Sequence, residues 1–325
     1  MPKPYVSVVV ATYNRKEQLK ECLNSLFNQT YPKDRYEIIV VNDGSIDGTE
    51  EVLKEYERRA PCRFKWFTQK NQGVAVAMNL GIKNATGEII CFTGDDCVAD
   101  KYWIEKLVDG FTDEKIGGVG GEIVAYNPKT LAEKYGNPFD QKRNAKEYLL
   151  TGNAAYKKHI LEKIGGFDSN LRSLVDPDLG IRVKAEGYEL KYVPGAIVYH
   201  RHYQTLSWLI KRNYFLGLMF CRLSRKYTHH FFMRYYIPKY TLILIKAIII
   251  YPFGIIFYKK RKDFVIRNFF QILIIASTLA GMLKGVVTEK YLGEKFEKKL
   301  DFLGEESFRV YIKKILKKLF KINAF

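Results

Sequence analysis

The alternation of short apolar strands with amphipathic helices over the first 100 residues is the feature that most constrains the fold. Strands are predicted where β-branched and aromatic residues run together, at Tyr5–Ala11, Tyr36–Val41, Phe64–Thr68 and Glu88–Thr93. Helices are predicted where apolar residues recur on one helical face, at Lys16–Gln29, Glu50–Arg59 and Val74–Asn84. This order predicts an α/β fold with a mostly parallel sheet, right-handed crossovers and flanking helices.

Polar loops follow several of these predicted strands. Thr12–Arg15 follows the first strand, Asn42–Thr49 follows the second, and Asp95 and Asp96 come directly after the fourth. The carboxyl ends of parallel strands meet at one edge of a sheet, where α/β proteins bind ligands. The clustering favours a nucleotide site, although the second loop lacks the GxGxxG spacing and the chain contains no GxxxxGK[ST] sequence.

The adjacent carboxylates of Asp95 and Asp96 are candidate metal ligands. They supply the hard oxygen atoms that Mg²⁺ or Mn²⁺ prefers, and such a cation can carry a diphosphate. Asp is also common in turns and helix caps, and a helix is predicted shortly afterwards at Tyr102–Phe111. The residues alone leave both interpretations open.

A second group of polar residues lies further along the chain. A strand is predicted at Ile116–Ala125, and the irregular polar segment Asn127–Leu150 is a candidate for a mobile flap over the ligand site. Asp176 and Asp178 precede the predicted helix Leu179–Gly187, where acids are also favourable simply through the helix dipole. The last predicted strand, Leu190–Tyr199, ends in His200, Arg201 and His202, and histidines in such places are more often structural than metal-binding.

The net charge of +18 is confined to the C-terminal part of the chain. Residues 1–200 hold 28 Lys and Arg against 28 Asp and Glu, whereas residues 201–325 hold 25 against 7. No acidic residue occurs between Leu190 and Lys262, a region rich in aromatic and aliphatic residues. This composition suits an anionic membrane surface better than a nucleic acid. We expect a catalytic domain at residues 1–204 and a helical, membrane-associated region at residues 205–325.

Two long apolar segments, Ile237–Tyr258 and Phe264–Val287, flank the basic sequence Lys259–Lys262. Both are longer than the roughly 20 residues that a membrane-spanning helix needs. Two spans would place four basic residues outside the cell, against the positive-inside rule. We therefore expect a hairpin that dips into the cytoplasmic face of the cell membrane, although spanning stays open. Phe308–Ile322 has one apolar and one basic face and is expected to add a surface contact.

The five cysteines show no metal-binding spacing and are expected to be reduced, and the N-terminus enters a strand without a signal peptide. Both features agree with a catalytic domain on the cytoplasmic side.

The order of short motifs resembles that of the family 2 glycosyltransferases. The motifs, which span roughly residues 5–205, are Ser7–Asn14, Val41–Ser45, Asn71–Gly73, Asn79–Gly81, Ala85–Gly87, Gly94–Asp96, Thr151–Asn153, Gly165–Asp168 and Val175–Leu179. The resemblance implies a GT-A fold and transfer of a sugar from a nucleotide-diphosphate sugar with inversion of the anomeric centre.

The resemblance also implies roles for single residues. The nucleotide and donor would be bound by Thr12, Tyr13, Asn14, Asp43, Asn79, Asp95, Gly152 and Asn153. The metal would be held by Asp96 with Asp95, and completed by His200 in preference to His202. Asp176 would be the general base that deprotonates the acceptor hydroxyl, with Asp178 orienting the helix or loop.

Three positions depart from the pattern of the family. Gly94 stands where relatives often carry a further acid, which leaves the metal mainly to Asp96. Met78 replaces an arginine that relatives commonly place before Asn79, and Val175 replaces the glutamate before the base. Met78 removes one expected contact with the diphosphate, and Val175 removes one expected contact with the acceptor.

The sequence therefore predicts a membrane-associated, inverting glycosyltransferase that uses Mn²⁺ or Mg²⁺. A UDP-linked donor and a lipid-linked or membrane-proximal saccharide acceptor are expected. One alternative is a nucleotidyltransferase, which would need a basic Gly-rich loop after the first strand, where this chain has Ala11–Asn14. The other is a nonenzymatic membrane or nucleic-acid scaffold, which the neutral first 200 residues disfavour.

Overall fold

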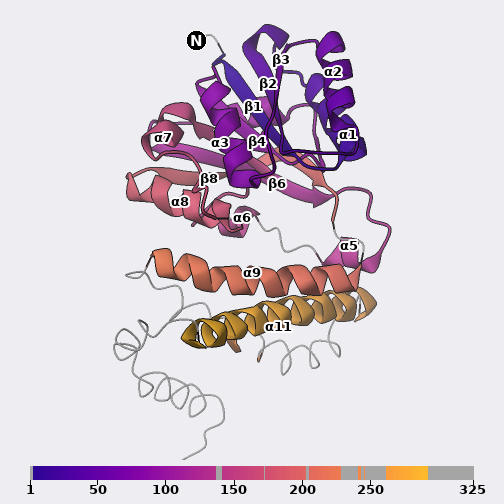
Figure 1. Ribbon diagram of the computed structural model, residues 1–325, viewed down its shortest axis with the longest axis vertical. Coiled ribbons are helices and arrows are strands. Elements are labelled where there is room, and N and C mark those ends of the chain that lie inside the picture. Colours follow the sequence, from indigo (N-terminus) through magenta and orange to yellow (C-terminus); the bar gives the residue numbers. More distant parts are fainter. Residues whose placement is uncertain are drawn as a thin grey trace, which may run out of the picture.

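The computed structural model describes residues 3–136, 141–171, 173–202, 205–227, 241–242, 245 and 261–291. An eight-stranded sheet in the order β3-β2-β1-β4-β7-β6-β8-β5 forms the centre of the protein (Figure 1). Its strands are β1 (Val6–Thr12), β2 (Tyr36–Asn42), β3 (Arg63–Thr68), β4 (Ile89–Thr93), β5 (Cys97–Ala99), β6 (Ile116–Ala125), β7 (Asn153–Lys157) and β8 (Glu189–His200). The expected α/β architecture is confirmed.

Helices flank the sheet and continue beyond it. The first set is α1 (Lys16–Phe27), α2 (Thr49–Arg59), α3 (Val74–Asn84) and α4 (Trp103–Asp109). The second is α5 (Leu131–Tyr135), α6 (Gln141–Asn144), α7 (Lys158–Lys163), α8 (Val175–Ala185), α9 (Leu206–Lys226) and α11 (Arg261–Tyr291).

The first half of the sheet is parallel, as the strand–helix alternation predicts. β1 pairs in parallel with β2 and β4, and β2 pairs in parallel with β3. Strand β1 is buried on both faces: Val8 and Val10 belong to one apolar core, whereas Val9 belongs to the other. Burial on both faces explains why this strand is an almost continuous run of valines rather than an alternating one.

The second half of the sheet is mixed, because β5 and β7 run against their neighbours. β7 is antiparallel to β4 and β6, and β5 is antiparallel to β8, whereas β6 and β8 are parallel. Neither β5 nor β7 was expected as a strand. The residues of β5 directly follow the acidic pair, and their pairing places Cys97 opposite His200.

Two expectations about irregular segments need correction. The segment Asn127–Leu150 contains helices α5 and α6, and Thr130 and Glu133 form a reciprocal cap at the start of α5. Leu209 of α9 and Phe270 of α11 pack with α5 in one small apolar cluster. Helix α8 begins at Val175, not at Leu179, so Asp176 and Asp178 lie within its first turn.

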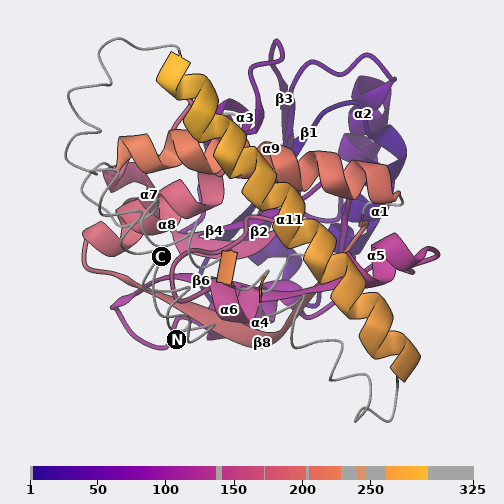
Figure 2. The ribbon, with the colours of Figure 1, turned by 90° about the horizontal axis from the view of Figure 1, so that it is seen from below.

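Helices α9 and α11 form a layer beside the sheet domain, with α9 nearer the sheet (Figure 1). Seen from below, α11 crosses α9 obliquely (Figure 2). The crossing needs glycine, because a Cβ on Gly217 would lie 1.9 Å from the Thr278 carbonyl oxygen and one on Gly281 would lie 1.9 Å from that of Tyr214.

Within the described residues, one stretch is long and apolar enough to cross a membrane, Val265–Gly285 of α11. The expected segment Phe264–Val287 is therefore helical. Nearly all of Ile237–Tyr258 and all of Phe308–Ile322 lie outside the described residues.

Candidate active site

The loops that follow β1 and β2 are bound to each other at the carboxyl edge of the sheet. The Asp43 amide donates to the Thr12 carbonyl oxygen at 2.9 Å. The Asn14 amide donates to Ser45 Oγ at 2.9 Å, and Asn14 Oδ1 accepts from the Ile46 amide at 2.8 Å. Asn14 has a φ of +51°, a conformation that Asn tolerates better than most residues. Its neighbour Tyr13 is left 48% exposed at this edge.

Asp43 is buried and organises the loop before α3. Its Oδ1 accepts from Gln69 Nε2 at 2.7 Å and from the Gln72 amide at 2.9 Å, and its Oδ2 accepts from the Gly73 amide at 2.9 Å. The carboxylate thus fixes the Gly-containing turn that opens α3, and its contact with a nucleotide stays a prediction.

Asp95 is the buried member of the acidic pair. Its Oδ2 accepts from Thr12 Oγ1 at 2.9 Å, and its Oδ1 accepts from Arg15 Nη1 at 3.0 Å. Burial raises the pKa of Asp95 from 3.8 to about 6; Arg15 opposes this shift, whereas Asp96 adds to it. Arg15 Nη1 also contacts Asp96 Oδ2 at 2.7 Å. One guanidinium therefore contacts both carboxylates and offsets one of their two negative charges.

Asp96, Cys97 and His200 bring ligand atoms within 4.8 Å of one another. His200 Nε2 lies 3.5 Å from Asp96 Oδ1, and burial lowers the pKa of His200 to about 4. The imidazole is therefore neutral near pH 7, which is the form that binds metals. Burial raises the pKa of Cys97 well above its usual 9, so this thiol stays protonated. The remaining nitrogen and oxygen donors, including nearby Asp95, fit Mn²⁺ or Mg²⁺.

A cleft of about 690 Å³ adjoins Asp96 on the side of α1 and α9. It is lined by Arg15, Gln18, Glu21, Asp96, Tyr126, Asn127, Lys129, Glu133, Arg201, His202, Thr205 and Trp208. The Arg201 guanidinium pairs with Glu21 and lies 4.6 Å from the centroid of the Tyr126 ring. His202 is buried and its Nδ1 lies 3.0 Å from the Glu133 carbonyl oxygen.

Asp176 lies in the first turn of α8, and Thr151 Oγ1 donates to its Oδ1 at 2.8 Å. Burial raises the pKa of Asp176 from 3.8 to about 6, and the bond from Thr151 opposes the shift. A carboxylate with this pKa is ionised at neutral pH and is a stronger base than an exposed Asp.

Gly152 connects this carboxylate with the acidic turn. Its carbonyl oxygen accepts from Thr93 Oγ1 at 3.1 Å, at the end of β4. The nearest atom to a Cβ built on Gly152 is 3.9 Å away, so the space beside it is open. Asp95 and Asp96 follow β4, and Thr151, which holds Asp176 of α8, lies just before the antiparallel neighbour β7, so both acidic groups are at the same end of the sheet.

Asn153 and Asn79 hold the scaffold together. Asn153 is fully buried; its Oδ1 accepts from Trp103 Nε1 at 2.8 Å, and its Nδ2 donates to the carbonyls of Glu122 and Ala196 at 2.8 and 2.9 Å. The Asn79 amide exchanges two bonds of 2.7 Å with the Phe167 backbone. Contact of either side chain with the donor stays a prediction.

Arg15 is the site residue for which the sequence analysis assigned no role. It ends the polar loop Thr12–Arg15 that follows the first strand, and a basic residue in that loop is a signal that could have pointed to it.

Comparison with known proteins identifies the family. The sequence profile described as glycosyl transferase family 2 matches residues 7–176, which is more than half of the chain. "Glycosyltransferase AglE" of Haloferax volcanii is 29% identical over 220 residues, covering 66% of this chain and 72% of that protein. A "dolichyl N-acetyl-alpha-D-glucosaminyl phosphate 3-beta-D-2,3-diacetamido-2,3-dideoxy-beta-D-glucuronosyltransferase" of Methanococcus voltae is 25% identical over 230 residues, covering 66% of this chain and 72% of that protein.

Among solved structures, the mannosyltransferase PcManGT from Pyrobaculum calidifontis, in complex with GDP-Man and Mn²⁺, has a similar fold. The TM-score is 0.61 at 20% identity, over 85% of this chain and 87% of that one. The strand-end acids, the GT-A fold and the profile match lead to one conclusion: the chain belongs to glycosyl transferase family 2 and is a glycosyltransferase that uses a nucleotide-sugar donor.

Proposed function

We propose that this enzyme transfers a sugar, with inversion, from a UDP-linked donor to a lipid-linked or membrane-proximal saccharide acceptor. The observation that carries this proposal is the placement of two acidic groups at one end of the sheet. Asp95 and Asp96 follow β4, and Asp176 is held by Thr151 just before β7, the strand that pairs with β4. One group suits a metal-bound diphosphate, and the other suits an attacking hydroxyl.

In the proposed reaction, the donor lies between these two groups. Asp96, Asp95 and His200 would hold a divalent cation, which supplies positive charge to the leaving diphosphate. Asp176 accepts the proton of the acceptor hydroxyl while its oxygen forms a bond to the anomeric carbon. The bond from that carbon to the diphosphate breaks, and the nucleoside diphosphate leaves. Thr151 holds one oxygen of Asp176 during this step.

Thr12, Tyr13, Asn14 and Asp43 are proposed to form the nucleotide pocket, with Gly152 beside the donor sugar. The mutual bonds of the loops after β1 and β2 support this pocket, because they fix its walls before a ligand arrives. Asn79 and Asn153 are proposed to support the site from within the scaffold, since their amides are already bonded to protein atoms.

The proposed acceptor and location rest on the C-terminal region and on one relative. The Methanococcus voltae relative is named for action on a dolichyl-linked sugar phosphate. In this chain, residues 205–325 carry the excess of positive charge, and α11 contains an apolar stretch of 21 residues. We propose that this region attaches the enzyme to the cytoplasmic face of the cell membrane and that residues 1–204 are the catalytic domain.

Thermal stabilisation by nucleotide sugars, with and without Mn²⁺, tests the proposal. UDP-sugars are expected to raise the Tm only when Mn²⁺ is present, and GDP-mannose serves as the competing donor. In Asp96→Asn the Mn²⁺-dependent part should disappear, because an amide cannot supply the charge that holds a hard cation. Unchanged Mn²⁺-dependent binding in this variant would remove Asp96 from the metal site. A preference for GDP-mannose would show that the donor carries guanosine and not the proposed uridine.

A further inference from the structure

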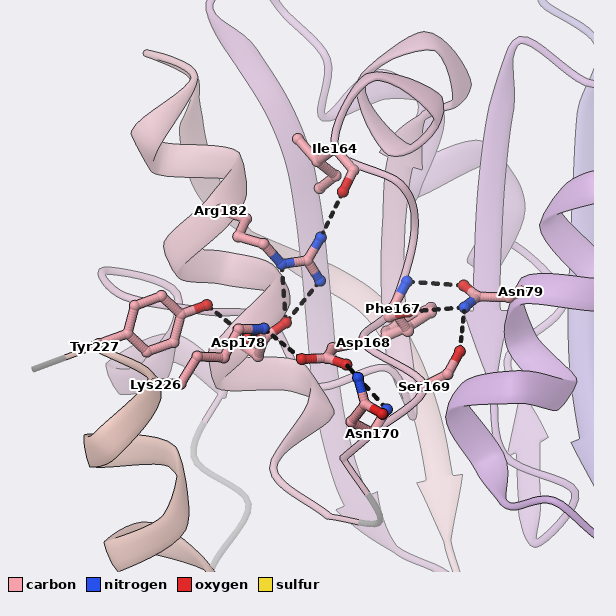
Figure 3. Close-up of polar contacts among 10 residues, drawn as sticks. All are labelled: Asn79, Ile164, Phe167, Asp168, Ser169, Asn170, Asp178, Arg182, Lys226 and Tyr227. Atoms are coloured by element: carbon pink, nitrogen blue, oxygen red, sulfur yellow. Dashed lines mark hydrogen bonds and ion pairs between the residues drawn. The ribbon is translucent and has the colours of Figure 1, made fainter. Parts of the chain in front are cut away.

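The helix that carries the proposed base is bonded to the end of α9 through a second, fully buried carboxylate. Asp178 is 0% exposed. Its Oδ2 accepts from Arg182 Nε at 2.9 Å and Nη2 at 2.6 Å. Its Oδ1 accepts from the Tyr227 hydroxyl at 2.6 Å and from the Lys226 ammonium group (Figure 3). The first turn of α8 is therefore held by two residues that follow it by about 50 positions in the chain.

The same ammonium group joins α9 to the loop before α8. Lys226 Nζ lies 2.6 Å from Asp168 Oδ2, and Asp168 Oδ1 accepts from the Asn170 amide at 2.9 Å. Arg182 also donates to the Ile164 carbonyl oxygen at 2.9 Å. Figure 3 shows these side chains converging between α8, α9 and the loop. Two acids and two bases balance in charge, which a cluster around a buried carboxylate requires.

The start of α8 has little local support of its own. Its N-cap residue, Leu174, has a φ of +60° and no side-chain capping bond. Such a conformation is unfavourable for a branched residue and persists only where surrounding contacts impose it. Asp176 and Asp178 are separated by one residue in this turn, so a displacement of Asp178 would move Asp176 as well.

We propose that Lys226 and Tyr227 are positioning residues for the general base: through Asp178 they fix the turn of α8 that carries Asp176. The inference rests on the proposed function of Asp176. It makes the seating of α9, a helix of the proposed membrane-associated region, a condition for correct placement of the base.

Hydrolysis of the donor, with water as the acceptor, gives a test that needs no knowledge of the natural acceptor. The probes are UDP-N-acetylglucosamine and GDP-mannose with Mn²⁺, and the variants are Lys226→Met and Tyr227→Phe. Tyr227→Phe removes one hydroxyl and keeps every charge, so it can test the inference even if Lys226→Met does not fold. Both should lower the hydrolysis rate by roughly ten- to a hundredfold, the effect of a misplaced group, with donor affinity unchanged.

Lys65→Met is the matched control. Lys65 Nζ lies 2.7 Å from Glu37, another carboxylate with 0% exposure. After the replacement Glu37 still has Arg63 as a charged partner, just as Asp178 still has Arg182 in Lys226→Met. This control should lower the Tm about as much as Lys226→Met, yet leave the hydrolysis rate within about twofold of the wild type.

The decisive measurement combines each variant with Asp176→Asn. A residue that acts only through the base should have no further effect once the base is gone, whereas a general structural role would lower the residual rate again. A further loss in the double variant, or behaviour like that of Lys65→Met, would overturn the inference. Wild-type hydrolysis by Asp176→Asn would instead overturn the proposed base and the inference built on it.

Discussion

Asp176 is held in an environment that disfavours its charge, and this makes its activity dependent on pH. Burial raises its pKa from 3.8 to about 6, so the basic form is complete above that pH and declines about tenfold per pH unit below it. The kcat/KM for donor hydrolysis should therefore rise with pH through about 6. Asp176→Asn should lower the rate by roughly two to four orders of magnitude. It should also abolish the rise of kcat/KM with pH.

Stability gives the control for this prediction. Because the folded-state pKa is raised, ionisation of Asp176 opposes folding as pH rises from the ordinary 3.8 through about 6. At pH 7, Asp176→Asn should thus be at least as stable as the wild type in urea unfolding. If Asp176→Asn keeps the rise of kcat/KM with pH, the titrating group is another residue.

Arg15 is expected to compete with the metal. Its guanidinium lies 3.0 Å from Asp95 and 2.7 Å from Asp96, where a divalent cation would also need these oxygens. Arg15→Met should tighten the binding of Mn²⁺ alone, because a competing charge is removed, but weaken binding of the nucleotide sugar, since a phosphate partner is lost. Electron paramagnetic resonance of free Mn²⁺ and calorimetry with UDP-sugar measure the two effects. Mn²⁺ affinity that stays constant or falls would contradict the competition.

The sequence could predict which site residues converge, but not how each is used. Asp95, Asp96 and His200 each follow or end a strand, and strand ends meet at known edges of a sheet. Asn153 belongs to the motif Thr151–Asn153, which is as specific as the acidic motif. Its side chain is nevertheless fully buried, because β7 runs antiparallel to its neighbours and turns it toward Trp103. Local sequence does not encode that direction, since it depends on which strands become neighbours.

Among the elements, β5 positions residues of the candidate metal site although it has only three residues. A segment this short carries no periodic signal, so its pairing with β8 could not be predicted. The pairing places Cys97 opposite His200, and the backbone amide of Arg201 donates to the Asp96 carbonyl oxygen at 3.1 Å. The longer strands β1, β2 and β4 were predictable because burial on both faces demands continuous apolar residues.

Asn153 ties several elements together, and this predicts a large loss of stability on its replacement. Asn153→Leu would leave three groups without their partner: Trp103 Nε1 and the carbonyls of Glu122 and Ala196. Each unsatisfied buried group costs about 1–3 kcal/mol, so urea unfolding should show a loss of roughly 3–9 kcal/mol for the three groups. Asn84→Ala, which removes one bond of 2.9 Å within α3, is the control and should lose about 1 kcal/mol. Equal losses for the two variants would contradict this structural role.

On the scale of the whole molecule, the layer of α9 and α11 defines a face that suits a membrane surface. Both helices lie across the long axis of the protein, and α11 is on the side away from the sheet (Figure 1). Phe215 of α9 and Phe269 and Leu283 of α11 are at least 46% exposed. With this layer against a membrane, α11 lies along the surface rather than through it. The expected hairpin stays a prediction against two spans, because nearly all of Ile237–Tyr258 lies outside the described residues.

Accessibility of the basic sequence Lys259–Lys262 separates these arrangements. In a hairpin, the four basic residues stay beside anionic headgroups on the cytoplasmic side, where each contributes about 1 kcal/mol of attraction. Two membrane spans would place these four basic residues on the outer side of the membrane. We expect Lys260→Cys, in a background without the five native cysteines, to react with an impermeant maleimide only after the cells are opened. Ile46→Cys, at a position that is 90% exposed in the catalytic domain, is the cytoplasmic control. Labelling of Lys260→Cys but not of Ile46→Cys in intact cells would establish two spans and exclude the hairpin.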